Sequence, residues 1–174
     1  MPALQDLREQ LQDSRSRLLR AISQVTEEQF KRRPPATSDD PSPWCIAEVL
    51  SHLLWTDNLW LKRIQLALDE EKATLTPSPP EAHDASIRAG RSSPVPQIIH
   101  GLIAARRQAD RLLERAESLG ETSLTRTAWH PRLEQDLSVE WMVREKLHAH
   151  EMEHSGQIER LRVLVGAAPV APGG

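Results

Sequence analysis

Residues 138–165, SVEWMVREKLHAHEMEHSGQIERLRVLV, carry the clearest helical pattern in the chain. Apolar residues recur there at steps of three and four, through Val143, Leu147, Ile158 and Leu161, and this spacing places side chains on one face of an α-helix. Ser138 precedes the pattern, and serine caps helix N-termini by accepting a hydrogen bond from a free backbone N–H. We therefore predict a helix that begins after Ser138, runs through Val165 and buries one apolar face.

Three further segments, residues 3–31, 44–72 and 94–119, show the same periodicity. The second and third follow the Ser-Pro pairs 42–43 and 93–94, in which serine caps a helix and proline occupies its first position. The first ends before Pro34, because proline disfavours helical geometry in the preceding residue, and the third stops at Gly120. Residues 44–72 are apolar around much of their circumference, so this helix should lie deepest.

Four amphipathic helices joined by polar connections predict an all-α fold, a four-helix bundle. No segment shows sustained alternation of apolar and polar residues, so no strand is expected. The connection over residues 73–92 is long for a compact domain, and it should cross the molecule, border a site or be mobile. We expect one domain over residues 1–166 and a flexible tail over residues 167–174.

Composition and charge narrow the class of protein. The 174 residues include 22 Lys and Arg against 25 Asp and Glu, a net charge of −3, whereas a dedicated nucleic-acid binder shows a basic excess. The single cysteine, Cys45, excludes an intrachain disulfide and a CxxC site, and a small buried residue is its preferred interpretation. No secretory signal or apolar run of roughly 20 residues is present. We expect a cytoplasmic protein with no nucleic-acid partner and no membrane contact.

The predicted fourth helix carries His150 and His154, four residues apart. Four steps turn a helix by about 400°, so both imidazoles project from one face, and they interrupt the apolar stripe that faces the core. This spacing suits a single metal ion, but core histidines satisfied by hydrogen bonds are the equal alternative. A third ligand has to come from another helix, and His52, in the most apolar one, is a candidate. The remaining candidates are interpreted as solvated polar residues: His83, His100 and His130.

Two motifs carry a resemblance to a known family. The first is W-x3-E-x3-H-L in the second helix, formed by Trp44, Glu48, His52 and Leu53, and the second is A-H-x3-H-x-G-Q-I over residues 149–158. Before the second motif, residues 129–142 (WHPRLEQDLSVEWM) are similar to a linker of the same family. In this order, and over nearly the whole chain, the sequence resembles the DinB/YfiT superfamily of metalloenzymes. This is the DNA-damage-inducible family, not the polymerase that shares its name.

The resemblance implies a four-helix bundle, frequently a homodimer, in which three histidines bind one divalent metal ion. Zinc and nickel are the leading metals, and iron and manganese are alternatives. Carried over motif by motif, the metal ligands are His52, His150 and His154. Some relatives, the bacillithiol S-transferases and mycothiol-dependent isomerases, use the metal to ionise a low-molecular-weight thiol, and others are regarded as hydrolases.

The expected function is therefore a metal-dependent thiol S-transferase, with bacillithiol, mycothiol or glutathione as one partner and a small-molecule electrophile as the other. The reacting group would be a metal-bound thiol or water. Two alternatives stay open: a metal-dependent hydrolase, and a non-catalytic metal-binding bundle with a role in stress response.

Three polar residues near the histidines remain to be assigned. Glu48, one turn before His52, and Gln157, one turn after His154, are candidates for residues that orient the ligands. An exposed charge near a helix start and a glutamine bonded to backbone are the respective alternatives. Residues 150–154 also match H-E-x-x-H, in which Glu151 would be the general base of a zinc protease. Because no histidine follows His154, we interpret Glu151 instead as part of the solvated face.

Overall fold

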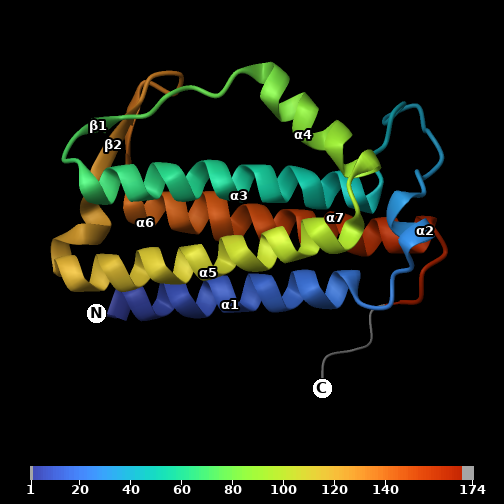
Figure 1. Ribbon diagram of the computed structural model, residues 1–174, viewed down its shortest axis with the longest axis horizontal. Coiled ribbons are helices and arrows are strands. Elements are labelled where there is room, and N and C mark those ends of the chain that lie inside the picture. The colour runs from blue at the N-terminus through green and yellow to red at the C-terminus, as the bar shows by residue number, and fades with distance from the viewer. Residues whose placement is uncertain (1, 170–174) are drawn as a thin grey trace.

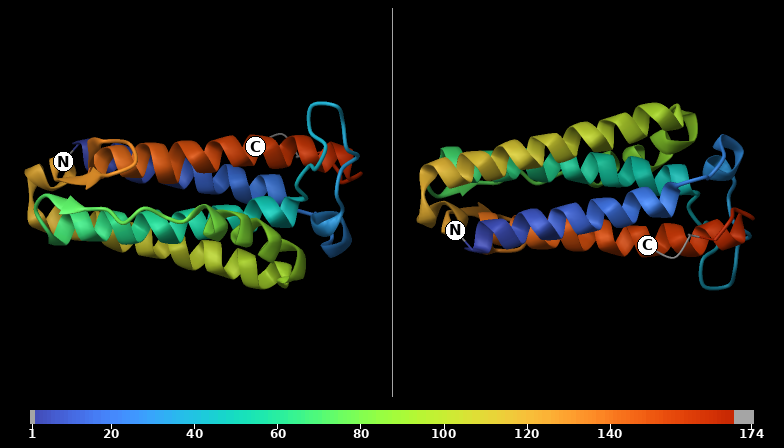
Figure 2. Two further views of the ribbon diagram at one scale, coloured as in Figure 1. Left: turned by 90° about the horizontal axis from the view of Figure 1, so that it is seen from above. Right: turned by 90° about the horizontal axis from the view of Figure 1, so that it is seen from below.

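In the computed structural model, which describes residues 2–169, four long helical rods lie side by side (Figures 1 and 2). They are α1 (Pro2–Ile22), α3 (Ile46–Asp69), α5 (Val95–Leu119) and a continuous rod built from α6 (Val139–Trp141), η2 (Met142–Ala149) and α7 (His150–Leu164). Helix α3 packs against α5, and α1 packs against α7. The predicted four-helix bundle is confirmed. No helix within residues 2–169 is long and apolar enough to cross a membrane.

The rod ends show which local signals set the helix boundaries. The hydroxyl of Ser138 accepts a hydrogen bond from the Trp141 amide at 3.1 Å, so the predicted cap is confirmed. Gly120 ends α5 with a φ of 91°, a conformation that glycine adopts without steric cost. The second predicted helix begins later than expected, because Cys45 rather than Ser42 occupies the capping position of α3.

The first predicted helix, over residues 3–31, is two helices, α1 and the short α2 (Glu27–Lys31). Gln24, with a φ of 58°, lies in the break between them. Thr26 then starts α2 with a capping box: its hydroxyl accepts from the Gln29 amide at 3.3 Å, and Gln29 Oε1 accepts from the Thr26 amide at 3.0 Å. The paired cap satisfies two free N–H groups and allows a new helix to begin.

A small sheet corrects the expectation that the chain has no strands. Its strands are β1 (Ala73–Thr74), β2 (Thr127–His130) and β3 (Gln135–Ser138), in that spatial order. β1 runs parallel to β2, with Ala73 opposite Ala128, and β2 pairs antiparallel with β3. Strands this short carry too few residues for an alternating pattern to be visible in the sequence. The sheet ties the connection after α3 to the connection after α5; between α5 and β2 lies the 3-10 helix η1 (Glu121–Thr125).

The connection over residues 73–92 is mostly helical, which the sequence interpretation as a loop missed. It contains α4 (Pro80–Ser92), which lies obliquely over the first half of α3 (Figure 1). Gly90 allows the close approach, since a Cβ atom there would collide with the backbone oxygen of Ala47. The connection therefore packs against α3 through α4.

Two apolar clusters fill the bundle, and polar residues lie between them along the rods. The cluster near the sheet takes Leu4, Leu7 and Leu11 from α1, and the cluster near α2 takes Leu18, Ala21 and Ile22 from the same helix. Buried polar residues from three of the rods, α1, α3 and α7, lie between or beside these clusters: Ser14, Arg15, His52, Thr56, Asp57, Glu151 and His154. We call this the polar layer.

The C-terminal segment is held as far as the structure describes it. Arg162 is buried, and its Nε donates to the Ala168 carbonyl at 3.0 Å, while its Nη1 donates to the Ala21 carbonyl at 2.8 Å. The expected flexible tail over residues 167–174 lies, from residue 170 onward, outside the described residues.

Candidate metal centre

Three histidines from two rods meet in the polar layer. His150 Nε2 lies 3.3 Å from His52 Nε2 and 3.1 Å from His154 Nε2. His52 comes from α3, and the other two are one turn apart at the start of α7. One ring nitrogen from each lies within 4.8 Å of those of the other two, a separation that a single ion can span. We call these three residues the histidine cluster.

Two of the three rings in the histidine cluster, those of His52 and His150, are held uncharged. Burial lowers the pKa of His52 to about 4, and that of His150 to about 3, and repulsion from the neighbouring histidines adds to both shifts. Both rings are therefore neutral at pH 7, and a neutral ring has one nitrogen with a proton and one with a lone pair. A single proton on His150 Nε2 can point at only one of its two neighbours, His52 Nε2 or His154 Nε2. The other pair of nitrogen atoms then has no proton between them.

Gln157 fixes the orientation of one ring. Its Oε1 lies 2.7 Å from His154 Nδ1, and because an amide oxygen only accepts, Nδ1 carries the proton and Nε2 presents its lone pair to the cluster. The Nδ1 atoms of His52 and His150 are buried and have no hydrogen-bond partner within the described chain. The alternative of core histidines satisfied by hydrogen bonds is therefore not what this geometry shows.

Glu48, the other expected orienting residue, does not hydrogen-bond to His52. It is fully buried, neither orienting the ring nor exposed near the helix start. Its carboxylate accepts from the Cys45 amide at 2.9 Å, from Arg33 at 2.8 Å and from Arg91. Burial alone would raise the pKa of Glu48, but these hydrogen bonds hold it below its ordinary value. Glu48 thus fastens α4 and the segment before α3 onto the start of α3.

Burial raises the pKa of the Cys45 thiol, in line with a small buried residue.

Glu151 is not on a solvated face, and that interpretation was wrong. It is 1% exposed, and its carboxylate contacts Arg15 at 2.9 Å, Arg106 at 2.5 Å and the Ser14 hydroxyl at 2.6 Å. These partners come from α1 and α5, and Arg15 also contacts Asp57 of α3 at 3.5 Å, so the Glu151 carboxylate lies in the bundle interior. Because these contacts occupy its carboxylate, Glu151 is not free to act as a general base beside the histidines. The interpretation of H-E-x-x-H as a zinc-protease motif therefore does not fit.

One side chain next to the cluster was missed in the sequence. His83, on α4, has its ring centroid 4.9 Å from that of His52, and Trp44 and Trp55 complete an aromatic wall at 5.4 Å and 6.4 Å from His52. The available signal was Pro79-Pro80 followed by Glu81, because proline at the first position and an acidic first turn mark a helix start. If a helix had been predicted there, His83 would not have been interpreted as a solvated loop residue.

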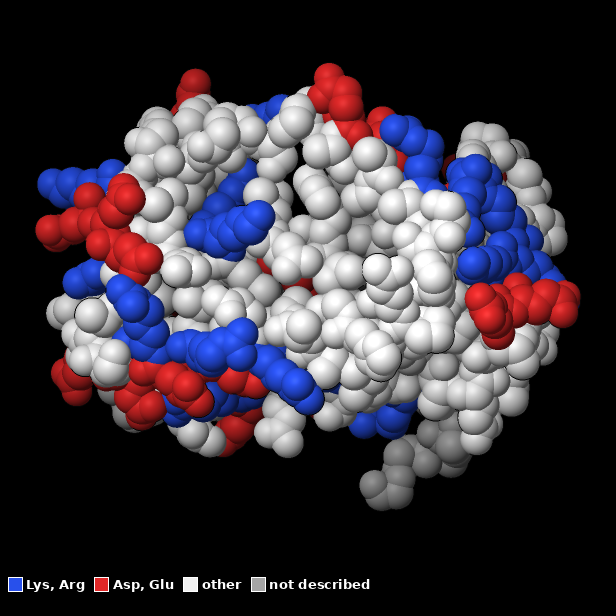
Figure 3. All heavy atoms as spheres, viewed as in Figure 1, with Lys and Arg blue, Asp and Glu red and all other residues white. Residues whose placement is uncertain are grey.

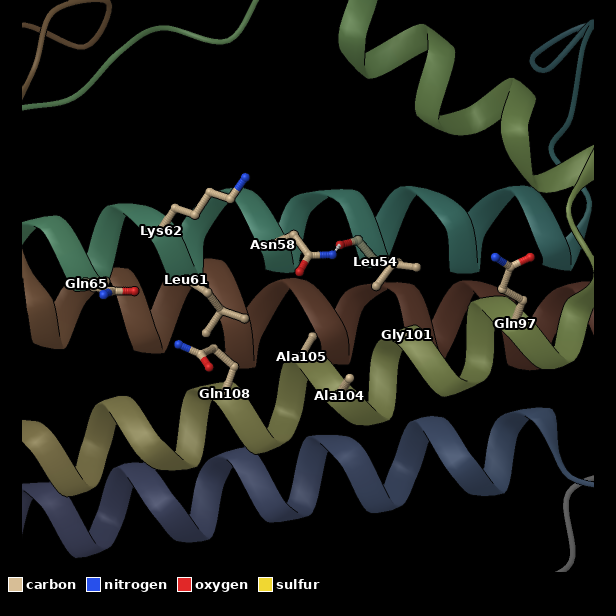
Figure 4. Close-up of a pocket in the computed structure, with 10 residues that line it drawn as sticks. All are labelled: Leu54, Asn58, Leu61, Lys62, Gln65, Gln97, Gly101, Ala104, Ala105 and Gln108. Carbon is tan, nitrogen blue, oxygen red and sulfur yellow. Dashed lines mark hydrogen bonds between the residues drawn. The ribbon is translucent and has the colours of Figure 1, made fainter.

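A pocket of about 350 Å³ opens beside His154, and its wall includes Trp44, Gln157, Glu153 and Arg160. A small molecule bound there would contact both charged and aromatic groups close to the histidine cluster. A larger groove of about 590 Å³ lies between α3 and α5, lined by amide side chains such as Asn58 and Gln108 (Figure 4), and none of the three histidines lines it. The smaller pocket is therefore the candidate substrate site.

Comparison with known proteins places this arrangement in a family. Residues 10–158 match the model of the DinB superfamily. The chain belongs to the DinB superfamily. The match spans all four rods and includes the three histidines, so the resemblance carried by the two motifs is confirmed.

Solved structures similar to this DinB superfamily member share its fold. YfiT from Bacillus subtilis, described as "a probable metal-dependent hydrolase with an unusual four-helix bundle topology", matches with a TM-score of 0.75 and 17% identity, over 95% of this chain and 89% of YfiT. An uncharacterised protein from Escherichia coli UTI89 matches with a TM-score of 0.71 and 10% identity, over 95% of each chain. A mycothiol-dependent maleylpyruvate isomerase matches with a TM-score of 0.59 and 16% identity, over 95% of this chain and 64% of the isomerase. No curated protein sequence matches the chain.

Proposed function

We propose that this protein is a metal-dependent enzyme in which His52, His150 and His154 hold one divalent metal ion through Nε2. The convergence of the three Nε2 atoms, at 3.3 Å and 3.1 Å from His150 to the other two, carries the proposal. The residues fit the ion, because the His52 and His150 rings are neutral, the lone pair of His154 is directed inward by Gln157, and a single proton on His150 Nε2 cannot bridge both contacts. Imidazole ligands suit zinc and nickel, and they also accept iron and manganese.

The favoured reaction is transfer of a low-molecular-weight thiol to a small electrophile. When bound to three neutral imidazoles, a divalent metal keeps its full charge and lowers the pKa of a coordinated thiol or water. The burial of Glu151 against Arg15 and Arg106 supports thiol transfer, since a thiol ionised in this way needs no general base. The similar mycothiol-dependent isomerase supports the same class of substrate. In this proposal the aromatic wall excludes water from the reacting side of the histidine cluster.

A hydrolase is the second candidate, and a specific residue favours it. Glu153 lines the pocket beside His154, and a carboxylate there can take a proton from an attacking water. The description of YfiT as a hydrolase points the same way. Substitution of Glu153 separates the candidates: Glu153→Gln should abolish hydrolysis and leave thiol transfer within a few-fold of wild type.

Elemental analysis of the purified protein tests the metal site. Wild type should retain close to one divalent ion per chain, His154→Ala should lose it, and His100→Ala, on α5 away from the histidine cluster, should keep it. A wild type with only trace metal, or equal retention in all three proteins, contradicts the proposal.

Activity assays then test the reaction. Bacillithiol, mycothiol and glutathione are each supplied with a fluorogenic electrophile, and conjugation should require the metal and His150. Conjugation that survives a chelator would rule out the mechanism. The remaining expectations are that the protein is a cytoplasmic homodimer with a single domain over residues 1–166; sedimentation velocity measures the dimer.

A further inference from the structure

A separate cavity of about 270 Å³ lies between α3, η2 and the turn that joins β2 to β3. Its polar wall consists mainly of Arg63, His130, Arg132 and Lys146, and no carboxylate lines it. We call it the basic pocket. The chain as a whole is close to charge balance, with 22 basic and 25 acidic residues, so three cations gathered without an acidic neighbour need a physical reason.

The cations of the basic pocket are not paired with acidic residues. Within residues 2–169, no ion pair involves Arg63, Arg132 or Lys146, although twelve other ion pairs join Arg or Lys to Asp or Glu there. Arg63 is only 7% exposed. Its Nη2 donates to the Thr76 carbonyl at 3.0 Å, while its Nε is buried and has no acceptor among the described residues. A buried guanidinium N–H without an acceptor is costly, and an anion in the pocket would supply one.

The remaining groups are oriented to donate. His130 Nδ1 accepts a hydrogen bond from the Leu133 amide at 3.3 Å, so in the neutral ring Nε2 carries the proton. Burial lowers the pKa of His130, and the charges of Arg63, Arg132 and Lys146 lower it further, as expected where the potential is positive. The indole of Trp60 positions two of the cations, with the Arg63 guanidinium 4.5 Å and Lys146 Nζ 5.6 Å from a ring centroid.

The basic pocket lies along the same two rods as the histidine cluster. Lys146 is four residues before His150, about one turn along the rod, and Leu59, which lines the pocket, is seven residues after His52. Both spacings keep the pairs on nearly one face of their helices. Figure 3 shows basic atoms in the recess between α3 and the segment that follows β1.

We propose that the basic pocket binds an oxyanion group, a carboxylate or a phosphate, of the small-molecule substrate. The basic pocket would hold this group on the two rods that carry the histidine cluster, apart from the pocket beside His154, and its part in the reaction rests on the proposed function. Its volume of about 270 Å³ equals that of about nine water molecules at ~30 Å³ each, which admits phosphate or a short dicarboxylate. The pocket therefore assigns an anionic substrate class to a site that the histidines alone leave undefined.

Titration calorimetry on the metal-free protein tests the pocket with two probes, inorganic phosphate and succinate. Arg132→Gln and Lys146→Gln remove pocket cations at exposed and half-buried positions, and each should weaken binding about tenfold, the loss expected for one charge-assisted contact. Lys62→Gln, an exposed change on α3 outside the basic pocket, is the matched control and should bind like wild type. Tighter binding of succinate identifies a carboxylate, and tighter binding of phosphate identifies a phosphate ester.

The proposal is overturned if neither probe binds at millimolar concentration, or if Arg132→Gln and Lys146→Gln bind as tightly as wild type. Because the titration uses metal-free protein, its outcome is independent of the metal site. Anion binding by a wild type that retains no metal would refute the proposed function and leave the basic pocket standing. Metal retention without anion binding would support the metal site of the proposed function and overturn the proposal for the basic pocket.

Discussion

Replacing Glu151 by glutamine should cost the fold more than it costs the metal site. The carboxylate is 1% exposed and contacts Arg15 at 2.9 Å, Arg106 at 2.5 Å and Ser14 at 2.6 Å. Glutamine keeps the size but removes the charge, so two buried arginines lose their closest compensation. Asp57 compensates Arg15 only in part, because its nearest oxygen is 3.5 Å from that guanidinium, against 2.9 Å for Glu151. Breaking a buried ion pair costs about 3–5 kcal/mol, which at about 2–4 °C per kcal/mol lowers Tm by roughly 6–20 °C.

Urea and thermal unfolding followed by circular dichroism measure this loss, with Glu153→Gln as the matched control. Glu153 is exposed, two residues along the same helix, and its substitution should change stability by less than about 0.5 kcal/mol. At a temperature where both variants are folded, Glu151→Gln should retain its divalent ion. A loss below about 1 kcal/mol would refute the ion-pair reasoning. A fully stable but inactive Glu151→Gln protein would restore Glu151 as a general base.

Three further perturbations test other parts of the structure. Gln157→Leu removes the acceptor that orients one ring and should weaken zinc binding by about 10–100-fold in a chelator competition; unchanged affinity would contradict that role. Burial raises the pKa of Asp57 from 3.8 to about 7. The folded state therefore holds the carboxyl proton of Asp57 more tightly than the unfolded state does. The stability that this group contributes is lost as the pH rises from about 4 to 7. Asp57→Asn should flatten that part of the stability profile, and an unchanged slope would contradict the assignment. Gly90→Ala forces a Cβ against the Ala47 backbone and should lower the free energy of unfolding by about 1–3 kcal/mol. In the control Gly156→Ala, the nearest atom to the new Cβ is an arginine side-chain nitrogen at 3.7 Å, so this variant should not be destabilised. Equal Tm values for the two variants would show that α4 is not tightly docked.

The parts of the fold that were predictable from the sequence depend on local signals. The Ser138 cap and the Gly120 stop act within a few residues, so they appear in the sequence as they do in the structure. The pairing of His150 with His154 follows from helix geometry alone. The meeting of this pair with His52 depends on how two rods pack, and it came from the family resemblance rather than from periodicity.

The wrong assignment of Glu151 has a physical cause: the helix predicted over residues 138–165 was interpreted as burying a single face. The rod containing α7 packs against α3 with one face and against α1 with another, so Glu151, turned away from the histidines, is buried as well. Helix α4 covers a face of α3 that a bare bundle would leave to solvent, and it brings His83 beside His52. A helix with neighbours on several sides shows a weaker amphipathic pattern than a surface helix does.

The π-helical segment Met142–Ala149 bears on which changes in chain length this protein can tolerate. A turn closed by i→i+5 hydrogen bonds holds one residue more than a turn closed by i→i+4 bonds. A relative that lacks one residue here can close the segment as ordinary α-helix, and the cap at Ser138 and the histidines of α7 then keep nearly the same orientation. The same deletion between His150 and His154 would turn one imidazole by about 100° relative to the other. Length variation in this rod should therefore be confined to the residues just before His150, and alignments of relatives should show their gaps there.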